Sequence, residues 1–215
     1  MGGLDRLYDR FILASSFHFV RLFIRFFVHC KVSGEENIPS GNKVLFLSNH
    51  ISAFDVFLVP WAIYSKYPNE YIRTAGKQEL FSIPFVGWLL KKVGGFPISR
   101  GRANISSIRT IEKYIKRSKV VLYPEGSRSV DSRIKSGNRM VGRIISVTRP
   151  IVVPVLVIGT EKLIPVGKTF PRIGAKIEVK FGPPVNLKEE FSNPSVKGAS
   201  TMIIEKVMKT ISGLS

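Results

Sequence analysis

Apolar and polar residues follow different patterns before and after about residue 30. Residues 4–28 are rich in Leu, Ile, Phe and Val, and four arginines interrupt them. On a helical wheel with roughly 100° per residue, an arc of about 80° contains four basic or titratable side chains, namely His18, Arg21, Arg25 and His29. Apolar residues occupy most of the remaining wheel. This pattern predicts an amphipathic helix with a narrow basic stripe and a broad apolar face.

Two questions about this N-terminal segment stay open. Arg6 and Asp9 lie off the basic stripe, so the segment is either one helix or two helices that meet near Ser15 and Ser16. Its apolar face either packs on the rest of the chain, which is the commoner fate, or docks into a membrane interface. The high density of aromatic residues favours docking, and we therefore predict that residues 1–30 form a membrane-docking segment.

The charged residues of the N-terminal segment are too closely spaced for it to cross a bilayer. Its longest run without Asp, Glu, Lys or Arg is the ten residues from Phe11 to Val20, whereas a spanning helix needs roughly 20. No small-residue cleavage site follows a short apolar core, so a signal peptide is not expected.

Beyond residue 30 the apolar residues form short runs that suit alternating strands and helices. Runs rich in β-branched or aromatic residues predict strands at 44–47, 71–74, 95–98, 120–123, 151–157 and 177–181. Amphipathic runs predict helices at 54–64, 102–117, 134–147 and 196–212. The alternation predicts one α/β domain over residues 31–215, with a single mixed or mostly parallel sheet flanked by helices.

Charge and cysteine content limit the binding partners and the cellular compartment that this domain is expected to have. The net charge is +18, from 33 Lys and Arg against 15 Asp and Glu, and 44% of the residues are hydrophobic. A basic chain suits either nucleic acid or an anionic membrane, and the positive mean hydropathy favours the membrane. Cys30 is the only cysteine, which excludes an internal disulfide and a Cys-based zinc site. A reduced cytosolic compartment is the simplest setting.

A histidine and an aspartate follow the apolar run 44–47. His50 and Asp55 are five residues apart, and such residues are about 140° out of phase on a continuous helix. They can meet only if His50 lies in the turn before a helix and Asp55 in its first turn. Asp55 would then orient the imidazole and leave its other nitrogen free as a general base. The alternative is a simple helix cap, because Ser52 to Asp55 has the S-x-x-D form of a capping box.

Two other predicted strand ends carry arginine. The turn after the strand at 120–123 contains Glu125, Gly126, Ser127 and Arg128, and Arg100 follows the strand at 95–98. Open α/β sheets bind ligands at the carboxyl ends of their strands. The Gly126–Arg128 turn and Arg100 therefore either bind a phosphate or carboxylate near His50 or are solvated at the strand ends, and Glu125 could hold a neighbouring arginine or bind a hydroxyl. Lys77 and Lys135 either add positive charge there or are solvated surface lysines.

Four sequence blocks in this order resemble those of a known family. They are N-H-x-S-x-x-D at Asn49–Asp55, G-F-x-x-x-R ending at Arg100, Y-P-E-G-S-R at Tyr123–Arg128 and V-P-V at Val153–Val155. The set resembles the glycerolipid acyltransferases, and within them most closely the bacterial 1-acylglycerol-3-phosphate acyltransferases. The resemblance covers about residues 40–160, and four ordered blocks are far more specific than one.

Three positions depart from the pattern of the family. Tyr123 stands where the family usually has Phe, and Ser127 stands where it usually has Thr. Pro97 removes a ladder donor inside the second block, which predicts that Arg100 is reached through an edge or bulged strand. None of these changes removes a chemical group that the reaction needs.

The resemblance implies an enzyme that acylates lysophosphatidic acid to phosphatidic acid in phospholipid synthesis. His50 would be the general base on the free glycerol hydroxyl, Asp55 would orient it, and no acyl-enzyme would form. Arg100 would bind the acceptor phosphate together with Gly126–Arg128, and Glu125 would support that site. The co-substrate would be an acyl thioester of acyl carrier protein or coenzyme A, with no cofactor and no metal. The enzyme would lie at the cytoplasmic face of the cell membrane as a peripheral or monotopic protein.

Other functions stay open at this point. The acceptor is alternatively glycerol-3-phosphate or another lysolipid, and the chain is alternatively a non-catalytic binder of anionic membranes. A nucleic-acid binder would need a basic patch with exposed aromatic residues for stacking, whereas the aromatic residues here concentrate in apolar runs. One such run, Phe81–Leu90, either lines an acyl groove, dips into lipid or belongs to the core.

Overall fold

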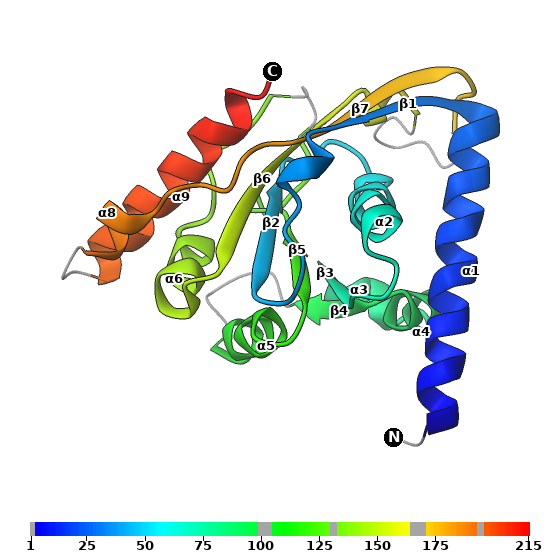
Figure 1. Ribbon diagram of the computed structural model, residues 1–215, viewed down its shortest axis with the longest axis horizontal. Coiled ribbons are helices and arrows are strands. Elements are labelled where there is room, and N and C mark those ends of the chain that lie inside the picture. Colours follow the sequence, from blue (N-terminus) through cyan, green and yellow to red (C-terminus); the bar gives the residue numbers. More distant parts are fainter. Residues whose placement is uncertain (1–2, 99–104, 130–132, 164–170, 193–195) are drawn as a thin grey trace.

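A seven-stranded sheet forms the body of the chain (Figure 1). The structure is a computed structural model that describes residues 3–98, 105–129, 133–163, 171–192 and 196–215. The strands are β1 (Val28–Ser33), β2 (Val44–Ser48), β3 (Ile72–Lys77), β4 (Gly95–Ile98), β5 (Lys119–Leu122), β6 (Ile151–Ile158) and β7 (Ala175–Phe181). Their order across the sheet is β1-β7-β6-β2-β5-β3-β4. Neighbouring strands run parallel except β6 and β7, which confirms the predicted mostly parallel sheet.

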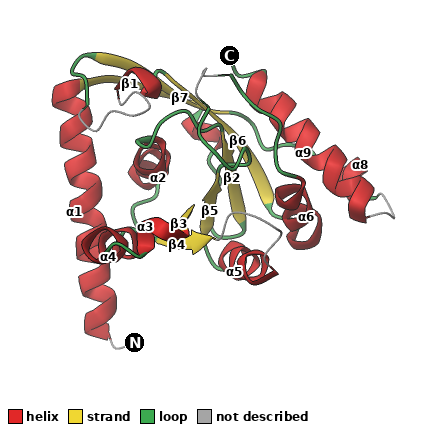
Figure 2. Ribbon diagram, turned by 180° about the vertical axis from the view of Figure 1, so that it is seen from behind, coloured by secondary structure: helices red, strands yellow, loops and turns green. Residues whose placement is uncertain are grey.

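Helices cover both faces of this sheet (Figures 1 and 2). They are α1 (Gly3–Phe27), α2 (Asp55–Lys66), α3 (Gln78–Phe81), α4 (Pro84–Lys92), α5 (Ile105–Ile115), α6 (Arg139–Thr148), α7 (Thr160–Leu163), α8 (Lys188–Phe191) and α9 (Val196–Ser212), with a 3₁₀ turn at Glu35–Asn37. The helix predicted at 196–212 has these bounds, and the predicted helices at 54–64, 102–117 and 134–147 each contain or overlap one that is observed.

Strand β2 at the centre explains why the core has two layers. All five of its residues are buried, and successive strand side chains point to opposite faces. Val44 and Phe46 join the core beneath α1 and α2, whereas Leu45 and Leu47 join the core beneath α5, α6 and α9. Because both faces are covered, the strand reads as a continuous apolar run.

The N-terminal segment differs from one of the two expected forms. It is a single helix, α1, without a break at Ser15 or Ser16. The ring of Phe17 packs against that of Tyr64 on α2 with centroids 4.7 Å apart, which fixes the middle of α1 on the domain. The chain then passes directly into β1, which pairs in parallel with β7 and was not predicted. Its residues alternate between apolar and polar, as in a half-buried strand, but the helix predicted over residues 1–30 covered the first of them.

Helix α4 was also not predicted, because Pro84 and Gly87 interrupt its apolar run. Pro84 lies at the start of the helix, where a missing backbone N–H has no cost. Gly87 is buried, and a Cβ at this position would lie 2.3 Å from the carbonyl oxygen of Phe81. The glycine therefore permits α4 to pack against the end of α3.

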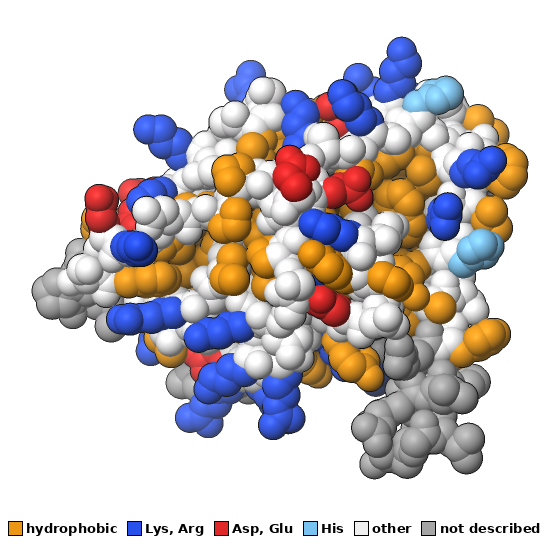
Figure 3. Space-filling model, viewed as in Figure 1, with side chains coloured by type: hydrophobic (Ala, Val, Ile, Leu, Met, Phe, Trp, Pro, Cys, Tyr) orange, Lys and Arg blue, Asp and Glu red, His pale blue; other side chains and the backbone are white. Residues whose placement is uncertain are grey.

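Apolar side chains remain exposed on two neighbouring parts of the surface. On α1 they are Phe11, Phe19, Leu22, Phe26 and Phe27, and on the α3–α4 segment they are Leu80, Ile83, Phe85 and Trp88. The basic stripe that the structure places on α1, His18, Arg21 and Arg25, is exposed as well; His29, which was predicted to belong to this stripe, lies on β1 instead. Figure 3 shows apolar and basic side chains together along the edge that α1 forms in Figure 1. Across the described helices, none is both long and apolar enough to cross a bilayer.

Candidate active site

The turn between β2 and α2 brings His50 and Asp55 together. Helix α2 begins at Asp55, and His50 lies in the preceding turn, as the five-residue spacing requires. Nδ1 of His50 lies 2.9 Å from Oδ2 of Asp55. Because a carboxylate only accepts hydrogen bonds, the proton of a neutral imidazole lies on Nδ1 and Nε2 is free of it. His50 is 6% exposed and Asp55 is fully buried.

Four donors among the described residues hold the carboxylate of Asp55. Its Oδ2 also accepts the backbone N–H groups of Ile51 and Ser52, each at 2.8 Å. The bond from Ser52 is the backbone contact that an S-x-x-D capping box would make, although α2 begins after Phe54, which has no side-chain cap. The same oxygen makes this contact and the histidine contact, so the two do not exclude each other. The other oxygen, Oδ1, accepts the hydroxyl of Thr160 at 2.6 Å.

Other bonds secure the two ends of this turn. The Asn49 amide donates to the carbonyl oxygen of Val157 at 2.9 Å and accepts the N–H of the same residue at 2.7 Å. The N–H of Ser129 donates to the carbonyl oxygen of His50 at 2.7 Å. The position of the imidazole is therefore set by β6 and by the segment after β5, not by the local turn alone.

Tyr123 contacts the histidine from the end of β5. Its ring centroid lies 4.4 Å from that of His50, and its hydroxyl donates to the carbonyl oxygen of Asp55 at 2.8 Å. Burial, and then the charge of Asp55, raise the pKa of Tyr123 well above its usual value. The hydroxyl consequently stays protonated and remains a hydrogen-bond donor at physiological pH.

Glu125 connects the third sequence block to the histidine. One carboxylate oxygen accepts the backbone N–H of His50 at 3.1 Å, and the other accepts the N–H of Lys135 at 3.4 Å. Burial raises the pKa of Glu125, while these two backbone bonds oppose the rise. The carboxylate thus bridges two backbone segments that face the candidate base.

The remaining predicted anion-binding residues line the same edge of the sheet. Gly126, Ser127 and Arg128 are exposed in the turn after β5, and Gly126 has a φ of 72° with open space where a Cβ would lie. Lys77 ends β3 opposite Ile98 of β4, and its ammonium lies 3.3 Å from the carboxylate of Glu79.

Arg100 lies outside the described residues. Strand β4, which leads toward it, is the edge strand of the sheet, as Pro97 predicts.

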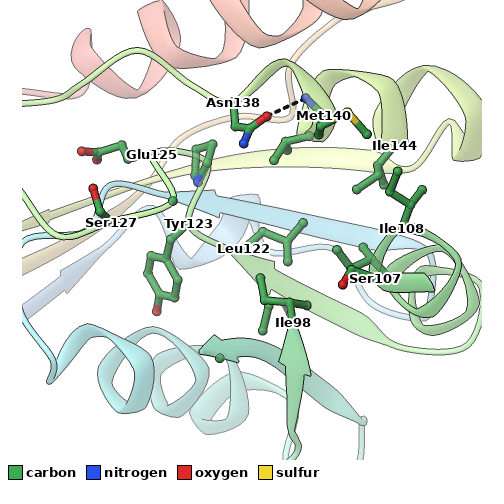
Figure 4. A pocket seen from close by; sticks show the side chains of 16 residues that line it. Ile98, Ser107, Ile108, Leu122, Tyr123, Glu125, Ser127, Asn138, Met140 and Ile144 are labelled. Atoms are coloured by element: carbon green, nitrogen blue, oxygen red, sulfur yellow. Dashed lines mark hydrogen bonds between the residues drawn. The ribbon is translucent and has the colours of Figure 1, made fainter. Parts of the chain in front are cut away.

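Two pockets flank the turn region from opposite faces of the sheet. One, of about 390 Å³, lies between α5 and α6 behind the Tyr123–Ser127 turn. Figure 4 shows Glu125 and Ser127 on that turn, and Ile108 and Ile144 on the two facing helices. The other, of about 570 Å³, is almost entirely apolar and lies between α1, α2 and α4. Phe54, the neighbour of Asp55, is part of its lining.

The sequence alone did not identify Thr160 or the partners of Asn49. Asn49 was part of the first block but had no assigned role, and Thr160 lies five residues beyond the fourth block. A hydroxyl side chain after the glycine that ends a buried strand is the only local signal of Thr160. Taken together, the arrangement offers one positioned candidate base, a buried carboxylate behind it and, nearby, several exposed groups that can donate hydrogen bonds to an anion.

Comparisons with known proteins agree with the fold and with the family resemblance of the sequence. A family model described as Acyltransferase matches residues 29–158. A chloroplastic 1-acyl-sn-glycerol-3-phosphate acyltransferase of Arabidopsis thaliana is 28% identical over 145 residues, which cover 66% of this chain and 39% of the relative. A 1-acyl-sn-glycerol-3-phosphate acyltransferase of Bacillus subtilis is 33% identical over 109 residues, which cover 50% of this chain and 53% of the relative. The matched region thus spans about two fifths to one half of these relatives.

A solved structure has the same fold. The crystal structure of the 1-acyl-sn-glycerophosphate acyltransferase PlsC from Thermotoga maritima superimposes with a TM-score of 0.72 and 24% identity. The superposition covers 98% of this chain and 83% of the other.

Proposed function

The chain belongs to the acyltransferase family, and we propose that it is a 1-acyl-sn-glycerol-3-phosphate acyltransferase. It would transfer an acyl chain from a thioester to the free hydroxyl of lysophosphatidic acid and form phosphatidic acid. The names of its relatives support this acceptor. The observation that carries the proposal is the 2.9 Å contact between His50 Nδ1 and Asp55 Oδ2, beside exposed residues that can donate hydrogen bonds to an anion.

In this proposal His50 is the general base. Its Nδ1–H donates to Asp55, so the unprotonated Nε2 takes the proton of the glycerol hydroxyl as that oxygen attacks. The carboxylate then stabilises the imidazolium that forms. Because the substrate supplies the nucleophile, no residue of the chain needs to be acylated.

The reaction balances within this site. The acceptor oxygen forms a bond to the thioester carbonyl carbon, and the tetrahedral intermediate loses the sulfur. The departing thiolate receives the proton that His50 had taken, which returns the imidazole to its neutral state. We assign no cofactor and no metal to this sequence of steps.

The acceptor phosphate would bind at the carboxyl ends of β4 and β5. We assign Arg100 and Arg128 as its charged donors, with Ser127 as a neutral donor and Gly126 leaving room for close approach. Glu125 would support this site by holding the backbone of His50. Lys77 is a weaker member of the set, because Glu79 already pairs with its ammonium.

The apolar surfaces support a lipid substrate that stays in the bilayer. We propose that the exposed apolar residues of α1 and of the α3–α4 segment enter the membrane interface, with the basic stripe of α1 on anionic headgroups. The apolar pocket beside Phe54 would hold an alkyl chain next to the base. The chain would lie at the cytoplasmic face of the cell membrane as a peripheral or monotopic protein.

The donor would be an acyl thioester of acyl carrier protein or of coenzyme A. The net charge of +18 suits both of these acidic donors as well as an anionic membrane, so charge does not choose between them. Direct comparison of the two thioesters with the purified protein decides the donor.

One assay tests the proposal. Purified protein is given each thioester with a panel of acceptors that contains lysophosphatidic acid, other lysolipids and glycerol-3-phosphate. We expect acylation of lysophosphatidic acid, and we expect His50→Ala to lower the rate by roughly 100-fold to 10,000-fold. His29→Ala is the matched control, because His29 is exposed on β1 and has no part in the proposed site.

Three outcomes would contradict parts of the proposal. An unchanged rate in His50→Ala would remove His50 as the base. Acylation of glycerol-3-phosphate in place of lysophosphatidic acid would correct the acceptor, and vesicle binding without any product would indicate a non-catalytic membrane binder.

A further inference from the structure

We propose that Thr160 is a positioning residue of the catalytic dyad, acting through Asp55. This inference rests on the function proposed above. The Thr160 hydroxyl donates to Oδ1 of Asp55 at 2.6 Å, and both residues are fully buried. The hydroxyl reaches no substrate from there, so any effect on catalysis must pass through the carboxylate.

The two oxygens of Asp55 are not held equally. Oδ2 lies within hydrogen-bonding distance of Ile51 N–H, Ser52 N–H and His50 Nδ1, whereas Thr160 supplies the one bond to Oδ1 found among the described residues. The terminal torsion of an aspartate is broad and only weakly restrained on its own. The bond from Thr160 therefore restrains rotation of the carboxylate and keeps Oδ2 directed at the imidazole.

The backbone around Thr160 places its hydroxyl at this point. Gly159 has a φ of 84°, and a Cβ there would lie 2.2 Å from the carbonyl oxygen of Lys176 on β7. Only glycine therefore allows the chain to turn tightly over β7 at the end of β6. Thr160 follows at once as the first residue of α7.

The same strand end also holds the other end of the catalytic turn. Val157 of β6 exchanges two hydrogen bonds with the side chain of Asn49, at 2.7 and 2.9 Å. Asn49 and Asp55 are the first and last residues of the block that contains His50. The segment Val157–Thr160 thus clamps both ends of that block, and Thr160 is the contact that touches the dyad itself.

The test measures acyl transfer to lysophosphatidic acid with variants of nearly equal volume. We expect Thr160→Val to lower kcat about tenfold to a hundredfold, with the acceptor KM changed less than about twofold, because substrate binding is untouched. Thr160→Ser keeps the hydroxyl and should retain kcat within about threefold of the native chain. If Thr160→Val does not fold, Thr160→Ala is compared with Thr160→Ser in its place.

A double-mutant cycle separates positioning from general structure. In the Asp55→Asn background the Thr160→Val change should lower kcat less than about twofold, because the carboxylate that it positions is gone. Thr148→Val is the matched control. Its buried hydroxyl donates to the Ile144 carbonyl within α6 at 2.7 Å, so its loss should leave kcat unchanged.

The outcomes distinguish the two proposals. If the native chain acylates lysophosphatidic acid and His50→Ala does not, the proposed function stands. In that case native kcat in Thr160→Val, or equal losses in the native and Asp55→Asn backgrounds, would overturn the role of Thr160. If the native chain has no activity on any acceptor, the proposed function has failed, and the role of Thr160 falls with it.

Discussion

Replacing Asp55 with Asn tests how much of the proposed rate depends on one buried charge. The side chain keeps its shape, so the amide oxygen can still accept the N–H groups of Ile51 and Ser52. The amide nitrogen then faces the Thr160 hydroxyl, which can turn to accept. The fold should therefore survive, while the negative charge behind His50 is lost.

The size of the effect follows from the geometry of the pair. Nδ1 of His50 lies 2.9 Å from Oδ2 of Asp55, which puts the centres of the two delocalised charges about 4 Å apart. At an effective dielectric constant of about 20, their attraction is about 4 kcal/mol. It is present only when the imidazole is charged, so it stabilises the transition state and not the resting enzyme. Since about 1.4 kcal/mol corresponds to a tenfold change in rate, kcat should fall about a thousandfold.

The assay is the initial rate of lysophosphatidic acid acylation in detergent micelles or vesicles, with thermal unfolding measured on the same samples. Glu178→Gln makes the same chemical change at an exposed carboxylate 3.9 Å from Lys180. Exposed ion pairs contribute less than about 1 kcal/mol, so this control should lose neither rate nor stability. If folded Asp55→Asn kept kcat within tenfold of the native value, the charge of Asp55 would not be stabilising an imidazolium.

Four further predictions use other parts of the molecule. Tyr123→Phe removes the hydrogen bond from the Tyr123 hydroxyl to the carbonyl oxygen of Asp55. It should lower the free energy of unfolding by about 1 kcal/mol with little change in kcat, and a fall in kcat above a hundredfold would give the hydroxyl a chemical role. Phe85→Ser, at a residue that is 72% exposed, should weaken binding to anionic vesicles in sedimentation, whereas Val147→Ser on α6 should not; equal binding by both would exclude α4 from the docking surface. Lys119→Met leaves the carboxylate of Glu70 without its buried partner and should lower the free energy of unfolding by about 3 kcal/mol in urea titration, against no change if the pair were solvated. Activity should persist in excess chelator, and loss that a divalent ion restores would require a metal in the mechanism.

Some strands could be recognised from the sequence and one could not, for a physical reason. β2 is buried on both faces and reads as an uninterrupted apolar run, as do the apolar parts of β5 and β6. β1 is partly exposed, carries polar residues and, among the described strands, pairs with β7 alone, which lies far along the chain. Its six residues alternate between apolar and polar, but this short pattern follows a long helical one directly, and the partner strand is far away in the sequence.

The start of helix α6 also depends on a contact that the local sequence does not show. The helix predicted from residue 134 begins at Arg139, because Asn138 caps it: the Asn138 side chain accepts the N–H of Met140, and the Asn138 N–H donates to the carbonyl oxygen of Pro124. The second of these bonds joins α6 to the turn after β5. Amphipathic spacing predicted the helix, but this contact with a distant turn decided where it starts.

The sequence by itself was enough to predict the chemistry that we propose for the site. The five-residue spacing of His50 and Asp55 predicts a turn before a helix, and the ordered blocks predict residues that bind an anion at other strand ends. These conclusions depend on short-range geometry, which the order of residues encodes directly.

Only the tertiary structure decided how that chemistry is held in place. Thr160 reaches Asp55 across 105 residues, and Val157 reaches Asn49 across 108. Both contacts exist because β6 lies beside β2 in parallel, so the carboxyl ends of the two strands meet at one edge of the sheet. Strand order is set by the packing of the whole core, and for that reason the residues that fix the dyad cannot be found near it in the sequence.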